Sequence, residues 1–467
     1  MNGPWDAIVI GAGPAGMTAV ATLSEGGART LIVDEQPAPG GQIYRAVERN
    51  RDNASLSAVL GSDYAGGAAL AARMRASASE LRFSTSAWRI DADGTVWTKT
   101  AGKVERLQAR ALVIASGAME RPVPAPGWTL PGVMTIGALQ IMLKDAGLRP
   151  SGRLVLVGCG PLFYLFAAQC LEAGVSDLVL LDTAKRANII PALRHLPKAV
   201  FGHGPGYLWK GLRLMATLRR RGVKIHRGVS NPRIEGTGRA VAVSFQTGTR
   251  DLRVDLDLIA LHEGVIPSQQ IARSIGCAHR WDEGQQCFVP VLDPMGESSI
   301  PGIFIAGDSG GIVGAAASAH AGTLCALAIL KRLGKISDTE FAGRYAVARR
   351  ALDAHLTIRP FLDRLYRPRD EVLVPADDVV VCRCEAIRAG AIRDVVRQGC
   401  LGPNQAKAFL RCGMGPCQGR MCGPTVNAII ARETGQTPDA TGYYRIRPPL
   451  KPITVGELAS QYEGDLT

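Results

Sequence analysis

The chain has 467 residues, of which 46% are hydrophobic and 20% charged, so it is globular and long enough for about two to four domains. Its net charge is +13, but no dense Lys/Arg run or basic motif accompanies this charge. We therefore expect an Arg-rich solvated surface and no nucleic-acid partner. No signal peptide is visible, which predicts a cytoplasmic protein with reduced thiols. The uncharged run 154–171 contains a Gly-Cys-Gly-Pro turn, which favours a strand, turn and helix over a transmembrane segment.

The first predicted elements are a strand over residues 6–10, the glycine-rich turn GAGPAG and a helix. The first glycine permits the tight turn, the second lets a pyrophosphate approach the backbone, and the third lets helix and strand pack closely. The N-terminus of the helix then faces the phosphates. The predicted cofactor-binding residues of this turn are Gly11, Gly13, Pro14, Ala15 and Gly16.

A second strand, RTLIVDE, follows the helix and ends in two acidic residues. Asp34 lies 18 residues after Gly16, at a place where an acidic side chain accepts hydrogen bonds from ribose hydroxyls. Glu35 is the neighbouring alternative. Because strand, turn, helix and acid occur together, this segment predicts a dinucleotide site rather than an unliganded glycine-rich turn.

Three further stretches decide which dinucleotide is expected. They are PAPGGQIYR, ALVIASGAMERPVPAPG and IPGIFIAGDSGG. With the first turn they resemble the two-dinucleotide-domain flavoproteins that include thioredoxin reductase and ferredoxin reductases. The resemblance implies an α/β fold and FAD, and it gives the Gly-Asp aspartate a hydrogen bond to the ribityl or phosphate region of the flavin. The residues that it adds to the predicted FAD site are Gly41, Gln42, Ser116, Gly117, Gly307 and Asp308.

A second strand–turn–helix begins at RLVLVGCGPLFYLF, and its next strand ends at Asp182. Gly158 and Gly160 are in place, but Phe163 occupies the third glycine position, where helix and strand should pack closely. We therefore expect this domain to hold another ligand or none, rather than NAD(P)H in the ordinary way. The cysteines of the flavoprotein part form no C-x-x-C, so a disulfide mechanism like that of thioredoxin reductase is not expected.

Six of the 11 cysteines fall between Cys382 and Cys422. They include a C-x-C pair, 32 intervening residues and a C-x4-C pair in the glycine-rich loop GMGPCQGRMCG. Thiolates suit zinc and iron–sulfur centres alike, although C-x-C is unusual for structural zinc. Reduced cytosolic thiols argue against disulfides. The residues alone leave zinc and iron–sulfur open.

The cysteine spacing resembles the bacterioferritin-associated-ferredoxin (BFD-like) type of 2Fe-2S domain. That resemblance implies that the metal ligands are Cys382, Cys384, Cys417 and Cys422. Cys412 falls where this motif needs no cysteine, and Cys400 is interpreted as structural. The expected fold is thus an α/β two-dinucleotide-binding-domain flavoprotein followed by a small helical BFD-like 2Fe-2S domain.

The order of these motifs, with the tail YYRIRPPLKPITVGELA, resembles the large (alpha or A) subunit of hetero-oligomeric flavin-dependent amine and amino-acid dehydrogenases. These include opine (octopine and nopaline) oxidases, D-hydroxyproline dehydrogenase, and relatives of hydrogen cyanide synthase and sarcosine oxidase. The resemblance implies an electron-transfer subunit with FAD and a 2Fe-2S cluster. It also implies a glycine/sarcosine-oxidase-like beta subunit that oxidises the C–N bond of the substrate. The same resemblance is compatible with a small third subunit, with FMN at a subunit interface, and with a nucleotide in the second domain.

The alternative is a stand-alone NAD(P)H-dependent reductase that passes electrons from FAD to its own cluster, and Phe163 argues against it. We expect no catalytic residue in this chain, because the histidines show no partner that would make a constellation. The electron acceptor is not indicated. The predicted organisation is an FAD domain (1–125 and 290–335), an inserted second dinucleotide domain (126–289), a helical linker broken near Pro360 (336–376), the 2Fe-2S domain (377–435) and a tail (436–467).

Overall fold

The N-terminal domain of the computed structural model, which describes residues 4–460, is built on a parallel five-stranded sheet. Residues 461–467 of the predicted tail lie outside the described residues. The fifth strand, β20, returns from far along the chain to pair with β7, so the domain is formed by two separate pieces of sequence. In sheet order the strands are β20 (Ile303–Ile305), β7 (Leu112–Ile114), β1 (Ala7–Ile10), β2 (Thr30–Val33) and β3 (Glu80–Arg82).

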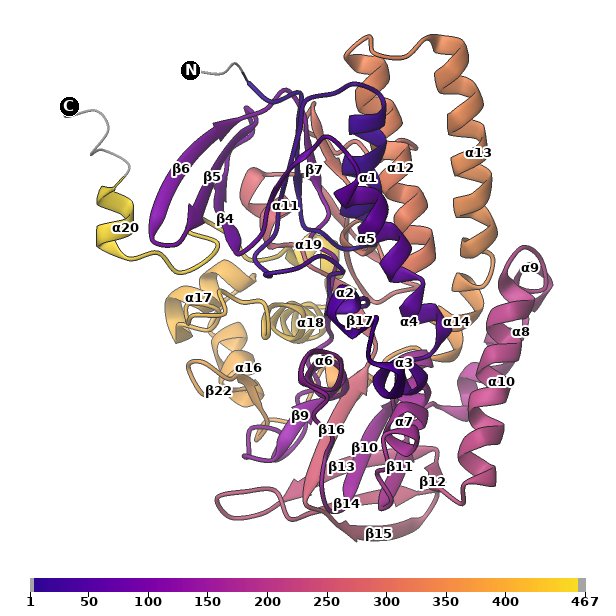
Figure 1. The fold of residues 1–467 in the computed structure, drawn as a ribbon. Helices are drawn as coiled ribbons and strands as arrows, with labels where there is room; N and C mark the ends of the chain where they lie inside the picture. Colours follow the sequence, from indigo (N-terminus) through magenta and orange to yellow (C-terminus); the bar gives the residue numbers. More distant parts are fainter. Residues whose placement is uncertain (1–3, 461–467) are drawn as a thin grey trace.

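This sheet is covered on both faces, which explains why β1 and β2 are buried at every position. One face carries three helices that lie side by side in Figure 1: α1 (Pro14–Glu25), α5 (Gly67–Arg75) and α12 (Ala315–Arg332). The other face packs against an antiparallel sheet made of β4 (Thr85–Ile90), β5 (Thr95–Thr100) and β6 (Lys103–Gln108). Three short helices lie between β2 and α5: α2 (Val47–Asn50), α3 (Ala54–Leu60) and α4 (Ser62–Ala65).

The second domain repeats this plan in the lower half of Figure 1. Its parallel sheet has the order β12 (Lys224–Arg227), β11 (Leu178–Asp182), β10 (Leu154–Cys159), β16 (Leu258–Glu263) and β9 (Val133–Thr135). One face carries α6 (Ile136–Ala146) and α7 (Pro161–Glu172), and the other packs against an antiparallel sheet of β13 (Val229–Glu235), β14 (Ala242–Thr247) and β15 (Arg250–Asp255). A two-stranded ribbon of β8 (Ala118–Glu120) and β17 (Val265–Pro267) joins the two domains.

Between β11 and β12 the chain forms a helical arm, consisting of α8 (Ile189–Leu193), α9 (Leu196–Ala199) and α10 (Gly204–Arg220), after a 3-10 turn at Arg186–Asn188. After the second domain, α11 (Gln270–Ile275) and the hairpin of β18 (His279–Asp282) and β19 (Cys287–Pro290) lead back to β20. Within residues 4–460, no helix combines the length and apolar character that crossing a membrane requires.

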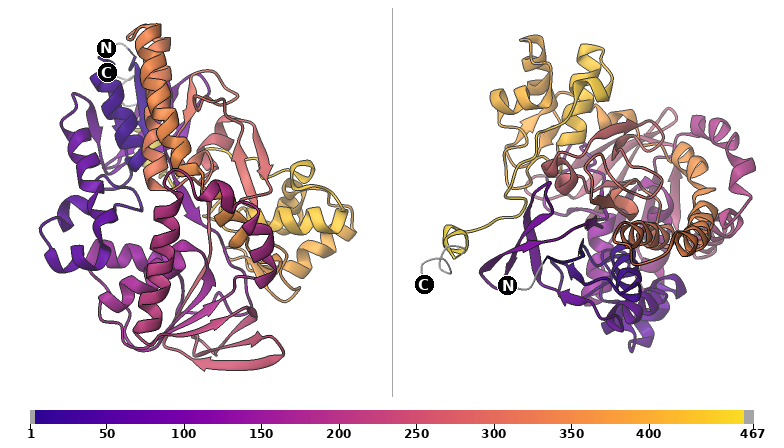
Figure 2. Two further views of the ribbon diagram at one scale, coloured as in Figure 1. Left: turned by 90° about the vertical axis from the view of Figure 1, so that its right-hand side faces the viewer. Right: turned by 90° about the horizontal axis from the view of Figure 1, so that it is seen from above.

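The linker follows α12 as a long helix, α13 (Asp338–Leu356), that packs along α12 (Figure 2). The helix ends before Pro360, and α14 (Arg359–Leu365) and α15 (Asp370–Leu373) continue the linker. The C-terminal domain contains β21 (Val380–Cys382), β22 (Ile387–Arg388), α16 (Ala389–Arg397), α17 (Pro403–Leu410), α18 (Gly423–Thr434) and α19 (Pro438–Thr441). The tail then crosses to the β4–β6 sheet, where α20 (Val455–Ala459) lies near β6.

Candidate cofactor sites

The first glycine turn has a backbone that tolerates no side chain at two of its three glycines. Gly11 has φ +105°, and a Cβ there would lie 2.5 Å from the carbonyl oxygen of Ala115. A Cβ on Gly16 would lie 1.8 Å from the carbonyl oxygen of Gly11. Gly13 precedes α1, and its Cβ would meet only a Cα of the neighbouring loop, at 3.9 Å. The N-terminus of α1 therefore has open space beside its free N–H groups, which fits a pyrophosphate.

The Gly-Gly-Gln loop lies directly against this turn. The Gly40 N–H donates to the carbonyl oxygen of Ala12 at 2.8 Å. Gly41 has φ +59°, and a Cβ there would lie 3.0 Å from the Cα of Gly13. Gln42 is exposed, and its carbonyl oxygen accepts from the Nζ of buried Lys144 at 3.1 Å. The structure thus brings the predicted residues Gly41 and Gln42 to the mouth of the turn.

The two acidic residues after β2 have different surroundings. Asp34 is buried, and its carboxylate accepts from the backbone N–H groups of Ala12 at 2.5 Å and Gln36 at 2.7 Å. Burial raises the pKa of Asp34. Glu35 instead points to the tail, where it forms an ion pair with Lys451 at 2.5 Å. Of the two predicted ribose ligands, only Asp34 hydrogen-bonds to the glycine turn.

The other predicted FAD residues lie at the carboxyl ends of β7 and β20. The carbonyl oxygen of Gly117 accepts from the Ser268 N–H at 2.9 Å, and Ser116 Oγ donates to the Ser268 carbonyl at 3.2 Å. A Cβ on Gly307 would lie 2.9 Å from the Cβ of Ala15. Asp308 Oδ1 accepts from the N–H groups of Val313 and Gly314, each at 2.8 Å, at the start of α12. The motif residues thus meet at one edge of the sheet.

The second glycine turn also leads from a buried strand into a helix, but its backbone differs before the helix, where Gly160 has φ 104° and Gly13 has φ −76°. Gly158 has φ +149°, and a Cβ there would lie 1.8 Å from the His262 carbonyl oxygen. Phe163 is fully buried in α7. The adjacent Tyr164 donates its hydroxyl to Asp182 Oδ2 at 2.7 Å. The acid that would bind a ribose is therefore already bound by a tyrosine of this chain.

The linker also covers the carboxyl end of the second sheet, a contact that the sequence did not indicate. Arg369 Nε lies 2.8 Å from Glu263 Oε1, and these side chains are 4% and 0% exposed. Thr183 Oγ1 donates to the same carboxylate oxygen at 2.9 Å. The ring of Tyr366 lies 6.5 Å from that of Tyr164, and burial raises the pKa of Tyr366. Side chains of α7, of the linker and of residues at the ends of β11 and β16 thus interact at the carboxyl end of the second sheet.

The four cysteines predicted as metal ligands form two adjacent pairs in the C-terminal domain. The thiols of Cys382 and Cys422 hydrogen-bond to each other, as do those of Cys384 and Cys417. The contact with Cys422 lowers the pKa of Cys382 to about 6, and backbone N–H groups, including that of Gly413, also act to lower it. Within the described residues no group of three or more His, Cys, Asp or Glu is arranged to hold one metal ion. Two pairs of thiolates instead fit a cluster with two irons and four cysteine ligands.

Two side chains next to these pairs show how the loop is held. Tyr444, which the sequence indicated only as part of the tail motif, is 2% exposed, and its hydroxyl lies 3.4 Å from Cys412 Sγ and 3.7 Å from Cys422 Sγ. A Cβ on Gly413 or Gly419 would lie within 2.7 Å of the Tyr444 ring. Cys412 therefore contacts Tyr444, and the glycines of the loop make room for this ring.

The cysteine loop is attached to the flavoprotein part at several points. Gln270 Nε2 in α11 donates to the Gln418 carbonyl at 3.0 Å. Gln270 follows Ser268 by two residues, and Ser268 hydrogen-bonds to Gly117. Arg420 Nη2 donates to the Leu450 carbonyl at 2.8 Å, and the Leu450 N–H donates to the Trp88 carbonyl at 2.7 Å. Residues 268–270 thus hydrogen-bond to Gly117 at one end and to Gln418 of the cysteine loop at the other, and so link the two candidate cofactor sites.

The histidines considered from the sequence lie away from both sites. His262 Nδ1 lies 2.6 Å from Glu120 Oε1. His203 and His320 each stack with His355, with ring centroids 4.0 Å and 5.6 Å apart. His195 precedes α9 on the helical arm. None of these contacts links a histidine to the first glycine turn or to the cysteine pairs.

Two family models match this chain. Residues 5–322 match the pyridine nucleotide-disulphide oxidoreductase family, and residues 380–432 match the BFD-like [2Fe-2S] binding domain. The chain is 50% identical to the A subunit of opine oxidase from Rhizobium meliloti (98% of this chain, 99% of that protein). It is 30% identical to the HcnB subunit of hydrogen cyanide synthase from Pseudomonas protegens (96% of each).

Among solved structures, L-proline dehydrogenase from P. horikoshii shares the fold with a TM-score of 0.69 at 18% identity, covering 98% of this chain and 80% of that one. The predicted fold class, the oxidoreductase assignment and the pair of FAD and 2Fe-2S cofactors are confirmed. The chain belongs to the family of opine oxidase A subunits, in which a pyridine nucleotide-disulphide oxidoreductase fold is joined to a BFD-like 2Fe-2S domain.

Proposed function

We propose that this chain is the electron-transfer subunit of a hetero-oligomeric dehydrogenase that oxidises the C–N bond of an opine, a D-amino acid or a hydroxyproline-type substrate. Oxidation takes place at a glycine/sarcosine-oxidase-like beta subunit, and this chain passes the electrons to an external acceptor. The observation that carries the proposal is the link between the two candidate cofactor sites: Ser268 hydrogen-bonds to Gly117, and Gln270, two residues along the chain, hydrogen-bonds to Gln418.

The residues of this chain bind and orient cofactors rather than substrate. FAD exchanges electron pairs and a 2Fe-2S cluster exchanges single electrons, so the two together connect a two-electron oxidation to a one-electron acceptor. The carboxylates of Asp34 and Asp308 accept hydrogen bonds from backbone N–H groups. These hydrogen bonds fix the two turns that would face FAD.

The closed second turn supports this function over that of a stand-alone reductase. An NADH site needs a free acid at the end of the second strand, an NADPH site needs a basic side chain there for the 2′-phosphate, and both need a free edge at the glycine turn. Here Tyr164 binds Asp182, and the buried Arg369–Glu263 pair lies over the same edge. A nicotinamide nucleotide would have to displace a buried ion pair, which is costly because each charge would lose its partner.

The test is anaerobic spectroscopy on the complex of this chain with its beta subunit, combined with iron, sulfide and flavin analysis. We expect two irons and two sulfides per copy of this chain, reduction of both cofactors by an opine or D-amino acid, and none by NADH or NADPH. Rapid reduction of the isolated chain by NADPH would instead establish the stand-alone reductase. Reduction by neither donor, with both cofactors present, would refute the proposed substrate class.

A further inference from the structure

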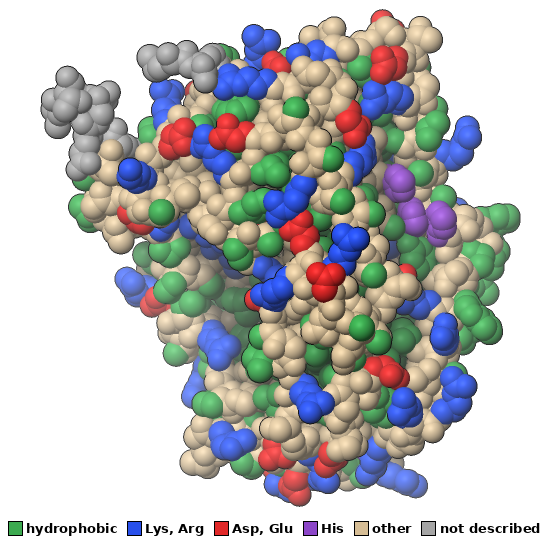
Figure 3. All heavy atoms as spheres, in the orientation of Figure 1, with side chains coloured by type: hydrophobic (Ala, Val, Ile, Leu, Met, Phe, Trp, Pro, Cys, Tyr) green, Lys and Arg blue, Asp and Glu red, His purple; other side chains and the backbone are tan. Residues whose placement is uncertain are grey.

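The helical arm formed by α8, α9 and α10 carries an unusual concentration of exposed apolar side chains. Eight of the 19 exposed large hydrophobic residues described lie within residues 189–212. Ile190, Phe201 and Trp209 are 73%, 67% and 70% exposed. Figure 3 shows hydrophobic side chains gathered at the right-hand edge, beside the histidines. Contiguous apolar surface of this kind marks a binding face on a water-soluble protein.

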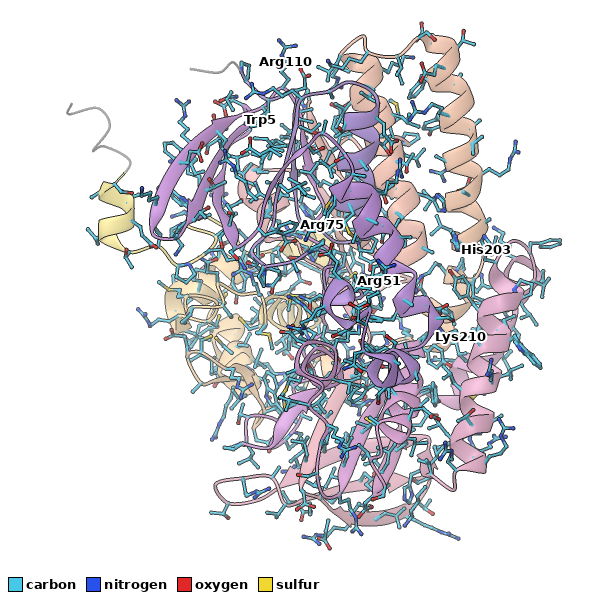
Figure 4. The ribbon with its side chains drawn as sticks, viewed as in Figure 1. Trp5, Arg51, Arg75, Arg110, His203 and Lys210 are labelled. Atoms are coloured by element: carbon cyan, nitrogen blue, oxygen red, sulfur yellow. The ribbon has the colours of Figure 1, made fainter. Side chains whose placement is uncertain are left out.

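The same arm is strongly basic. Residues 189–220, which make up the arm, contain six Lys and Arg residues and no Asp or Glu. Lys210, which Figure 4 labels on this edge, pairs with Asp63, and Arg221 pairs with Glu172. Among the described residues no carboxylate forms an ion pair with the exposed cations Arg194, Lys198, Arg213, Arg219 or Arg220. The arm therefore presents positive charge that the rest of this chain does not neutralise.

In α8 and α10, apolar and cationic side chains lie next to each other on the solvent-exposed face of the helix. In α10, Trp209, Arg213 and Arg220 follow the spacing of one helix face, and buried Leu218 lies on the opposite face. In α8, exposed Ile190 and Leu193 lie beside Arg194. A protein–protein interface usually has an apolar centre depleted of lysine and a polar rim. Interspersed cations, aromatic and aliphatic side chains are instead typical of elements that lie in the headgroup region of a bilayer.

We propose that the α8–α10 arm is a peripheral docking surface for an anionic lipid membrane. Its cations face the negatively charged headgroups, and Ile190, Phe201 and Trp209 enter the boundary between headgroups and acyl chains. The charge of the arm is complementary to such a surface, and the tryptophan is of the type that concentrates at membrane interfaces. The 2Fe-2S domain lies on the far side of the molecule from the arm (Figures 1 and 2), so it stays accessible from the water phase.

The test is vesicle flotation with the purified full-length chain in its cofactor-loaded form. The probes are vesicles of phosphatidylcholine with roughly one third phosphatidylglycerol, and vesicles of phosphatidylcholine alone. We expect flotation with the anionic vesicles only, a shift of tryptophan fluorescence to shorter wavelength, and release at about 0.5 M salt, where charges are screened within a few ångströms. Absence of binding to the anionic vesicles at low salt would overturn the proposal.

Variants separate the arm from the rest of the surface. Trp209→Ser and the double change Arg213→Glu with Arg220→Glu are expected to lower the vesicle partition coefficient at least about tenfold. The matched controls are Val455→Ser, which removes an 85% exposed apolar side chain in α20, and Lys103→Glu with Arg250→Glu on the exposed hairpins. The controls should bind like the unchanged chain, and flavin and iron contents should not differ among the proteins.

Two results would overturn membrane docking by the arm. Equal flotation of the arm variants and the unchanged chain would show that lipid binds elsewhere. Protection of the backbone amides of residues 186–213 from hydrogen exchange in the complex with the beta subunit, without flotation of the free chain, would make the arm an interface between subunits. Either result would overturn membrane docking, and neither would alter the proposed electron transfer, which is measured by reduction of the cofactors.

Discussion

The two glycine turns of this protein share a fold and differ in what occupies the space beside them. In both domains a buried parallel strand leads through a Gly-x-Gly turn into a helix that begins with a proline. At the first turn Asp34 binds only backbone N–H groups and the helix N-terminus has open space. At the second turn a Cβ on Gly160 would also meet open space, but Tyr164 binds the acid Asp182 and Arg369 of the linker pairs with Glu263. Side-chain replacement can thus occupy the acid of a nucleotide site while the sheet and the turn are kept.

The sharpest test of this comparison uses two glycines, one from each turn, that have nearly the same φ angle. Gly11 has φ +105° and Gly160 has φ +104°, but only a Cβ on Gly11 collides with backbone, because nothing lies within 4 Å of a Cβ on Gly160. We expect Gly11→Ala to lose all bound flavin. Gly160→Ala should retain the flavin and lose about 1–3 kcal/mol of stability, because φ 104° with ψ 173° is a backbone conformation that residues with a Cβ rarely adopt. Flavin-to-protein ratios and thermal unfolding would measure both, and equal flavin loss would contradict the distinction.

The next largest effect is expected at the buried ion pair that closes the second turn. Arg369→Ala leaves the Glu263 carboxylate buried without its cation, which should lower the free energy of unfolding by about 3–5 kcal/mol. Arg397→Ala is the control, because its pair with Asp394 is 64% and 62% exposed and should contribute less than about 1 kcal/mol. Denaturant unfolding of both variants measures the difference. Similar small losses would show that the linker does not close this site.

Parallel changes at the two acids should affect flavin binding differently. Asp34→Asn places an amide opposite backbone N–H groups that need an acceptor, so the flavin dissociation constant should rise about tenfold or more. Asp182→Asn alters a residue that contacts Tyr164 and should leave flavin affinity unchanged. Fluorescence titration of the apoprotein with FAD would measure both constants. An equal rise in both would mean that the two acids have a shared structural role.

The glycine turn and the C-x-C pair could be predicted because their residues are close together along the chain, whereas Ser116 and Asp308 were assigned only through the resemblance of their motifs. The turn from Gly11 to Gly16 and the spacing from Cys382 to Cys384 are set by local geometry, and the fold class follows from their order. The Arg369–Glu263 pair, the Lys451–Glu35 pair and the contact of Tyr444 with Cys412 join distant segments. Such contacts leave no periodic signal in the sequence. Phe163 indicated that the second turn was altered. It did not indicate that Tyr164 would bind Asp182 or that the linker would pair with Glu263.

The smallest expected effect concerns Lys144, which lies between the two domains and donates to the carbonyl of Gln42 and to Gln140 Oε1. Burial lowers the pKa of Lys144 to about 7. The folded protein therefore binds fewer protons here than the unfolded chain at any pH between about 7 and the ordinary lysine pKa of 10.5. In this window the free energy of unfolding should rise with pH, by no more than about 1.4 kcal/mol per pH unit, and the gain should disappear below pH 7. Lys144→Met lacks this titration, so the stability difference between the two proteins should change over pH 7–9. Parallel curves of stability against pH for the two proteins would show that Lys144 is protonated throughout and holds the loop that contains Gln42 as a permanent cation.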